Sequence, residues 1–474
     1  MKLARLLLPF LLICQCASAL PELGSSASSA PSFYKQKAQW RHIIDSTWGK
    51  GPPLAEKLAL FDAFTAELTQ SFSCFRSLGL DWDSLKSATR SKIDSSTSRG
   101  RFAAIMGRLA WNLRDFHTWA IDTPVILAPL RPGTPVLNLI PFCSAESFGA
   151  VLTVLPDSTA AVLRAVPNHP LGLSPGDVIL GYEGVPWKTL VRELLDAEIP
   201  MGSPGCGARS AQTHALMRAV GSNWHLFDSI DVLKYSTRQV QHLPVAPLAA
   251  LPSEFLFANE QQPIPGIASA YCGFNPRSLF DPTMPRKPVA FGWLPGTEIG
   301  YIQVVVEWQT LADDQFLTAY TALKDSKGLI IDMRWNVGGW SFFNATFAKM
   351  FSRRTVTIED AVRSGSDLFT LVPSGNSDIY AIPGNAGALY EHPIAVLLGP
   401  TCVSMGDLTA QRLRYHPMVR FFGKPPIASI GSSRSFPAPG DWVISYTYAD
   451  AFHVSRPGEY LNRSEFPIDE PVWF

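Results

Sequence analysis

The sequence predicts a mixed α/β fold built from three successive parts, and three changes of pattern support this prediction. From about Gln36 to Leu113, apolar residues recur at helical spacing. From about Pro135 the period shortens to that of strands, and from Gly300 short apolar strands alternate with helices. Such alternation is typical of a mainly parallel sheet covered by helices, so the last part is expected to hold the main sheet.

The N-terminal region is expected to contain a signal sequence and then a helical domain. Residues 1–19 combine two basic residues, an apolar run too short to span a bilayer, and the small-residue sequence "ASA", which together predict a secretory signal cleaved after Ala19. The protein is therefore expected to be secreted or periplasmic. Residues 20–130 form the predicted helical domain, with one amphipathic helix in 55–75 and a second that starts at 99 and ends near Arg114.

The middle region, residues 131–239, is predicted to be rich in strands. Two apolar strand patterns precede "LGLSPGDVILGYEG", a turn, strand and tight turn, and "KTLVRELLD" follows as a helix. This order over 148–196 resembles a PDZ domain, a module that accepts an extended peptide end as an added strand. Residues 240–297 are rich in proline and are interpreted as an insertion or linker.

The C-terminal region, residues 298–474, is predicted to be the α/β core. Its strands are expected in "GYIQVVVE", "KGLIIDMRWN" and "PIAVLLG", and its helices in "LADDQFLTAYTALKDS", "SFFNATFAKMFS" and "SMGDLTAQRLR". The segments "RWNVGG" and "TCVSMGD" follow directly after strands. Because sites in parallel sheets form at the carboxyl ends of strands, both segments are candidates for one site.

Composition and cysteine content exclude several classes of function. Lysine plus arginine and aspartate plus glutamate both number 40 in the 474 residues, so no net charge favours nucleic acid or an anionic membrane surface. Five of the seven cysteines remain after signal removal, at positions 74, 143, 206, 272 and 402, which is too sparse for a disulfide framework. Zinc-binding spacings are absent from the sequence, and no metal or other cofactor is expected.

Ser404 occupies a position that suits a nucleophile. It lies at the tight joint between a buried strand and a helix, where a hydroxyl is exposed beside free backbone N–H groups. Gly338 and Gly339 follow the neighbouring strand and allow backbone N–H groups to approach a ligand closely. With the N–H of Met405, they are predicted to form an oxyanion hole, whose donors are each worth about 3 kcal/mol of transition-state stabilisation.

These segments resemble the three core motifs of the C-terminal-processing (tail-specific) serine peptidases and their tricorn-protease relatives. The motifs are "GYIQV", "GLIIDMRWNVGG" and "AVLLGPTCVSMGDLTAQRLR", and a PDZ domain ahead of the core also belongs to this family. The resemblance covers about residues 100–200 and 298–474. It implies a crotonase/ClpP-like core, a serine peptidase activity and Ser404 as the nucleophile.

The resemblance also suggests which residue is the general base that a serine nucleophile requires. The position of the lysine used by the processing peptidases falls on Ser429, and Lys424, in "FFGKPPIASIG", is offset from it. The tricorn-like branch instead uses a histidine in a "Leu-x-Asp-x-His-Thr" motif, and "LRDFHTW" places His117 there. His225 and Lys424 remain alternative bases.

The residue that orients the histidine is left open by the sequence. In the tricorn-like branch it is an acid shortly before a Pro-Asp motif, and here that position is Asn462, with Glu465 nearby. The sequence thus predicts a secreted serine endopeptidase that acts on peptides or protein tails, with a peptide or protein as its partner. The alternative is a catalytically weak peptide- or ligand-binding protein on the same fold, since the family also contains binding proteins.

Overall fold

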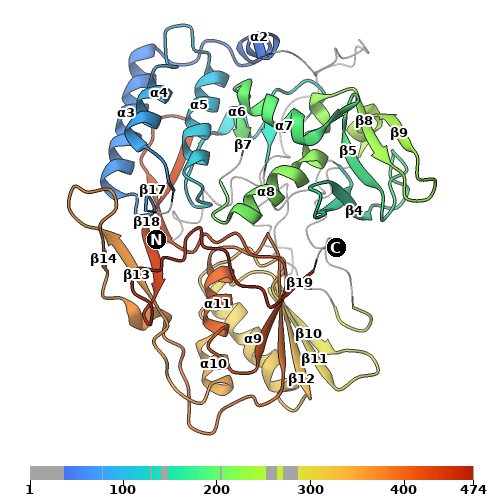
Figure 1. The fold of residues 1–474 in the computed structure, drawn as a ribbon, viewed down its shortest axis with the longest axis vertical. Coiled ribbons are helices and arrows are strands. Elements are labelled where there is room, and N and C mark those ends of the chain that lie inside the picture. Colours follow the sequence, from blue (N-terminus) through green and yellow to red (C-terminus); the bar gives the residue numbers. More distant parts are fainter. Residues whose placement is uncertain are drawn as a thin grey trace.

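The structure is a computed structural model that describes residues 37–472, except 77, 129–130, 140–147, 203–204, 252–263, 269 and 271–286 (Figure 1). The predicted signal sequence, Cys143 and Cys272 lie outside the described residues. Among the helices of the described part, none has the length and apolar character that crossing a bilayer requires.

The main sheet lies in the C-terminal part and has six strands in the order β10-β11-β12-β15-β16-β19. All neighbours are parallel except β10 and β11. The strands are β10 (Val289–Trp293), β11 (Ile299–Val304), β12 (Gly328–Asp332), β15 (Ile394–Leu398), β16 (Val419–Gly423) and β19 (Glu470–Pro471). Their order confirms the predicted mainly parallel α/β sheet.

Three helices pack on this sheet: α9 (Gln309–Leu323), α10 (Asn344–Met350) and α11 (Met405–Leu413) (Figure 1). Phe316 on α9 and Phe347 on α10 are buried in one cluster with Ile302 and Val396 of the strands. Each helix overlaps a stretch of predicted helical periodicity. Burial of this apolar layer fixes the carboxyl ends of β12 and β15 beside each other, where both candidate segments begin.

The N-terminal helices share their core with strands from the far end of the chain. The helices are α2 (Lys37–Trp48), α3 (Leu54–Ser71), α4 (Trp82–Arg90), α5 (Arg99–Asn112) and the short α6 (Thr123–Ile126). Phe64 and Met106 are fully buried in a cluster that includes Ile444 and Tyr446. Figure 1 shows α3 and α5 beside the C-terminal strands.

Those strands belong to a second, antiparallel sheet in the order β1-β18-β13-β14, with β17 paired to β18. They are β1 (Trp119–Asp122), β13 (Ile358–Arg363), β14 (Leu371–Pro373), β17 (Ser432–Phe436) and β18 (Trp442–His453), and the 3₁₀ helix η4 (Ser377–Tyr380) lies between β14 and β15. Because β1 pairs with β18, the chain that follows α5 is held against the C-terminal region. The sequence did not predict this sheet.

The middle region forms a third sheet in the order β3-β4-β5-β8-β9, with β6 paired to β5. Its elements are β3 (Ala150–Val154), β4 (Ala160–Ala165), β5 (Val178–Tyr182), β6 (Val185–Pro186), α7 (Trp187–Asp196), α8 (Arg209–Arg218), the 3₁₀ helix η1 (Ala219–Leu226) and β8 (Ser229–Leu233). The short strands β2 (Leu137–Asn138) and β7 (Met201–Gly202) pair beside it. The strands and helix predicted over 148–196 are confirmed.

The proline-rich stretch 240–297 contains regular elements that its composition did not predict. β9 (Val240–Pro244) extends the third sheet, the 3₁₀ helix η2 (Ala246–Ala250) follows it, and β10 forms an edge of the main sheet. Strand pairing with β8 and β11 stabilises these segments, because ladder hydrogen bonds and neighbouring strands outweigh a weak local strand pattern. Residues 252–263 and 271–286 lie outside the described part.

Candidate active site

Ser404 lies at a strained turn between β15 and α11. Its backbone has φ 60° and ψ −120°, which is unfavourable for a residue with a side chain. The turn is held on both sides, since Gly406 donates to the carbonyl of Val403 and Leu408 donates to that of Ser404. Ser404 therefore precedes the first turn of α11, where backbone N–H groups lack helical partners.

The Gly338–Gly339 turn lies directly against this serine. A Cβ atom on Gly338 would be 2.8 Å from the Cβ of Ser404 and 3.2 Å from the N of Met405, and one on Gly339 would be 2.2 Å from the carbonyl O of Glu307. Their φ values of 81° and 144° also favour glycine. Both glycines are therefore required by close backbone approach, and the turn and the serine form one site.

A buried polar network fixes the position of the turn. The amide of Asn336 donates to Glu307 at 2.9 Å, and its Oδ1 accepts the N–H of Gly338 at 2.8 Å. Thr409 on α11 donates to the other carboxylate oxygen of Glu307 at 2.9 Å. Burial raises the pKa of Glu307 well above its usual value. The network connects α11 to the glycine turn, which fixes the serine relative to the N–H donors.

The two glycines differ in what their N–H groups can do. The N–H of Gly338 is already bonded to Asn336. Gly339 lies opposite Glu307 in an isolated parallel β-bridge, whose hydrogen bonds are made by the residues on either side of Gly339. The N–H of Glu307 donates to the carbonyl of Gly338, and the N–H of Trp340 donates to the carbonyl of Glu307. The N–H of Gly339 consequently points away from Glu307. Gly339 and Met405 are better placed than Gly338 to bind a developing oxyanion.

His117 reaches the serine from the loop between α5 and β1. Its Nε2 lies 3.1 Å from the Oγ of Ser404, although 287 residues separate the two in the chain. The imidazole is 6% exposed, and burial lowers its pKa below the usual 6.5, while the charge of Asp115 acts in the opposite direction. A neutral imidazole at this distance can accept the hydroxyl proton.

Asp115 anchors the histidine loop to the second sheet. One of its carboxylate oxygens accepts the hydroxyl of Thr118 at 2.5 Å and that of Thr447 on β18 at 2.6 Å. The backbone N–H of Thr447 donates in turn to the Thr118 hydroxyl. Asp115 is 1% exposed, so these bonds form away from water, where they position the loop strongly.

Ser429 anchors the same loop from the opposite side. Its Oγ accepts the backbone N–H of Phe116, next to the histidine, at 2.9 Å. The N–H groups of Ala428 and Ser429 donate to the carboxylate of Asp407 on α11, whose pKa burial raises to about 7. Ser429, at the position aligned with the family's lysine, thus connects the helix that follows Ser404 to the loop that carries His117. Sequence reasoning noted its position and missed this contact.

The two residues predicted as candidates to orient the histidine, Asn462 and Glu465, bond to other groups. The Oδ1 of Asn462 accepts the N–H groups of Ile430 and Gly431, and its amide donates to the sulfur of Cys74 at 2.8 Å. The carboxylate of Glu465 accepts the N–H and hydroxyl of Ser210 at the start of α8. These bonds connect loops around the site, and the charge that acts on His117 is that of Asp115.

The alternative bases lie in other environments. His225 is fully buried, its Nε2 lies 2.8 Å from the carbonyl O of Val136, and burial lowers its pKa to about 4. Lys424 donates to the Thr153 hydroxyl and to the Val154 carbonyl on β3, each at 2.9 Å. Among the three candidate bases, the structure therefore places His117 against the serine.

The match to a known family agrees with this geometry. Residues 298–458 match Peptidase family S41 and include Ser404 and both glycines. None of the curated proteins matches the chain by sequence. This region is therefore a Peptidase family S41 domain, and the protein is a serine-type peptidase.

Two solved structures, both of CPAF, share this fold. The structure of mature CPAF has a TM-score of 0.60 at 12% identity, covering 88% of this chain and 92% of that chain. That of mature CPAF complexed with lactacystin has the same score and identity, covering 88% and 94%. The photosystem II D1 C-terminal processing protease has a TM-score of 0.44 at 16% identity, covering 88% and 93%.

Replacing Ser429 tests its role in positioning His117. Ser429→Ala should lower kcat for a peptide about tenfold with KM nearly unchanged, because loss of one buried hydrogen bond costs about 1–3 kcal/mol and moves only the loop of the histidine. Ser429→Thr keeps a hydroxyl and should restore most of the rate. Ser432→Ala, whose hydroxyl is 3.4 Å from Asp360, is the matched control. A wild-type kcat for Ser429→Ala would contradict this role.

Proposed function

We propose that the protein is a secreted serine endopeptidase that cleaves peptides or protein tails, with Ser404 as nucleophile and His117 as general base. The observation that carries the proposal is the 3.1 Å contact between these two side chains, made by loops from opposite ends of the chain. The Peptidase family S41 domain supports the reaction class. The strained serine turn and the adjacent glycine turn support the mechanism.

In the first half of the reaction, the Oγ of Ser404 attacks the carbonyl carbon of the scissile peptide bond. Its proton passes to the Nε2 of His117, and the carbonyl oxygen becomes an oxyanion. The N–H groups of Gly339 and Met405 bind that oxyanion and stabilise the transition state. Burial lowers the pKa of His117, and the charge of the Asp115 carboxylate opposes this effect and favours the imidazolium that forms.

In the second half, the imidazolium gives its proton to the leaving amine, and an acyl-enzyme on Ser404 remains. His117 then removes a proton from a water molecule, which attacks the ester and releases the new peptide carboxylate. Each proton taken by His117 is returned, so the site is restored after each cycle. This sequence requires a histidine that is neutral at the start.

The substrate class follows from the third sheet. Its order of strands and helix supports a PDZ-like module, and β3 is an edge strand paired only to β4 among the described elements. Modules of this kind bind an extended peptide end by strand addition. The proposed substrate is therefore a protein or peptide whose terminal segment is accessible and extended.

A fluorophosphonate probe tests the activated serine directly. The wild-type protein should be labelled at Ser404, whereas Ser404→Ala and His117→Ala should not be labelled. Because both residues act as one unit, the double variant should lose little more peptidase activity than either single variant. His225→Gln is the control for a buried histidine outside the site. A folded protein that resists labelling would favour the peptide- or ligand-binding alternative, which the presence of Asn462 at the usual acidic position supports.

The pH dependence of kcat/KM tests His117 as the base. The base acts only when unprotonated, so activity should be absent at low pH and rise as the pH passes the pKa of His117. Because burial lowers this pKa, the acidic limb should lie below pH 6.5, with a plateau at neutrality. Residual activity of His117→Ala should lack this limb. A limb above pH 7 that persists in His117→Ala would show that another group is the base.

Export is proposed from the N-terminal sequence. The basic residues, apolar run and "ASA" of residues 1–19 support cleavage after Ala19. Protein expressed with the complete sequence in a secreting host should appear outside the cytoplasm and begin at Leu20. Mass analysis of the exported protein checks this, and material that retains Met1 would contradict it.

A further inference from the structure

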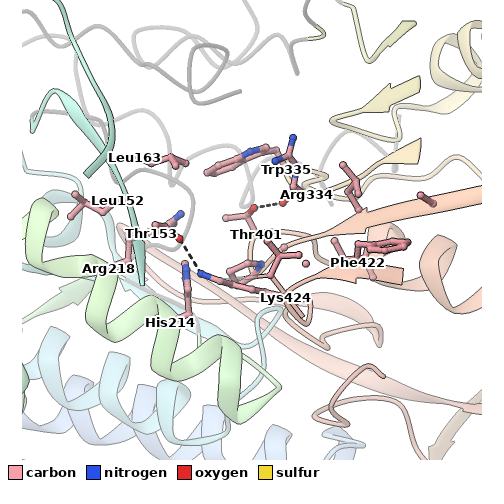
Figure 2. Close-up of a pocket in the computed structure, with 17 residues that line it drawn as sticks. Leu152, Thr153, Leu163, His214, Arg218, Arg334, Trp335, Thr401, Phe422 and Lys424 are labelled. Atoms are coloured by element: carbon pink, nitrogen blue, oxygen red, sulfur yellow. Dashed lines mark hydrogen bonds between the residues drawn. The ribbon is translucent and has the colours of Figure 1, made fainter. Parts of the chain in front are cut away.

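A large cavity lies between the third sheet and the main sheet. Its volume is about 630 Å³, within the usual range for small-molecule sites. One wall comes from β3, β4 and α8, and the other from the carboxyl ends of β12, β15 and β16 (Figure 2). Its lining includes neither Ser404 nor His117 nor the glycine turn. The cavity is therefore distinct from the proposed catalytic site.

Most of the cavity wall is apolar. Leu152 and Leu163 contribute from the third sheet, and Trp335, Leu398 and Phe422 contribute from the main sheet. In Figure 2, the side chain of Trp335 points toward Leu163. Such a surface favours a ligand with an apolar body, because filling the cavity removes apolar area from water.

Basic side chains gather at one part of the wall. Lys424, Arg218 and His214 lie close together in Figure 2, and Arg218 is only 2% exposed. Of the described residues, those that line the cavity include no aspartate or glutamate. A fourth basic residue, Arg334, is bonded through its guanidinium to Asp332 at 2.6 and 2.9 Å.

The electrostatics of this cluster favour an anion. Burial and the neighbouring Arg218 lower the pKa of Lys424 to about 8, and burial with both cations lowers that of His214 well below its usual value. The Nδ1 of His214 is also buried with no hydrogen-bond partner among the described residues. A negative group would offset the repulsion between the cations, whereas a cationic ligand would increase it.

The edge of β3 limits how a ligand can bind here. Lys424 already donates to the carbonyl of Val154 and the hydroxyl of Thr153 on this strand. A ligand that enters end-on with a charged group therefore meets Lys424 at this part of the edge. Its apolar body would then lie between the leucines of the third sheet and Trp335.

We propose that this cavity binds an organic carboxylate with an apolar body, its carboxylate facing Lys424, Arg218 and His214. The site goes beyond the proposed peptidase function and does not depend on it. The proposed occupant is a fatty acid, and a peptide that ends in apolar residues, which presents the same carboxylate, is a separate outcome of the test. Because Lys424 already connects the third sheet to the main sheet, the bound ligand would contact both.

Titration calorimetry on the full-length Ser404→Ala protein tests the site without cleavage of peptide ligands. Decanoate, below its micelle concentration, should bind at least about tenfold more tightly than decan-1-ol or decyltrimethylammonium, because only the carboxylate pairs with the cations. The peptide acetyl-Ala-Leu-Leu is tested in the same way, once with a free C-terminal carboxylate and once with an amidated C-terminus. Binding of decanoate alone identifies a fatty-acid type of ligand, and binding of the free peptide in competition with decanoate identifies a peptide end.

Two variants separate the charge from the apolar wall. Lys424→Gln retains hydrogen-bond donors and should weaken decanoate about tenfold while leaving decan-1-ol unchanged, and Leu163→Trp should weaken both by filling the cavity. Lys327→Gln, at an exposed lysine paired with Glu298, is the matched control. Three results would overturn the proposal. Decanoate and decan-1-ol could bind equally, decanoate binding could be unaffected by both variants, or neither carboxylate could bind. Probe labelling of Ser404 in the wild-type protein would remain independent of that outcome.

Discussion

The contact between His117 and Ser404 depends on a buried clamp around the loop that carries the histidine. Asp115 fixes this loop to Thr447 on the antiparallel sheet, and Ser429 fixes the N–H of Phe116 to the segment held by Asp407. Both anchors join regions more than 300 residues apart. The N-terminal helices consequently cannot serve as an independent module, because the histidine is in place only when they pack against the C-terminal strands.

A second buried network holds the other half of the site. Glu307, Asn336 and Thr409 connect the end of the parallel sheet to α11, and Asn336 directly accepts the N–H of Gly338. Ser404 and Gly339 both have a positive φ, which is unfavourable for most residues. These hydrogen bonds from the surrounding structure hold the backbone in that conformation. The folded chain thus holds the Ser404 hydroxyl and the neighbouring N–H donors in a geometry that an isolated loop would not maintain.

The carboxyl ends of the strands in the main sheet border two different chemical environments. On one side, Ser404, His117 and the glycine turn form the proposed catalytic site. On the other, Lys424 and Arg218 provide positive charge beside apolar walls, with Lys424 joining the main sheet to β3. The carboxyl ends of the parallel strands therefore organise both the proposed chemistry and the proposed carboxylate site, as strand ends in such sheets commonly do.

Local patterns in the sequence determined the element types and the candidate residues. Short continuous apolar runs in "GLIIDM" and "IAVLL" predicted buried parallel strands, and "LRDFHTW" and "TCVSMGD" pointed to His117 and Ser404 by their motifs. The tertiary structure alone decided that β18 would pair with β1, that Ser429 would hold the histidine loop, and that Asn462 would bond to the 430–431 backbone. These contacts join distant segments of similar local character, and only packing of the whole chain selects among the partners that each polar group could adopt.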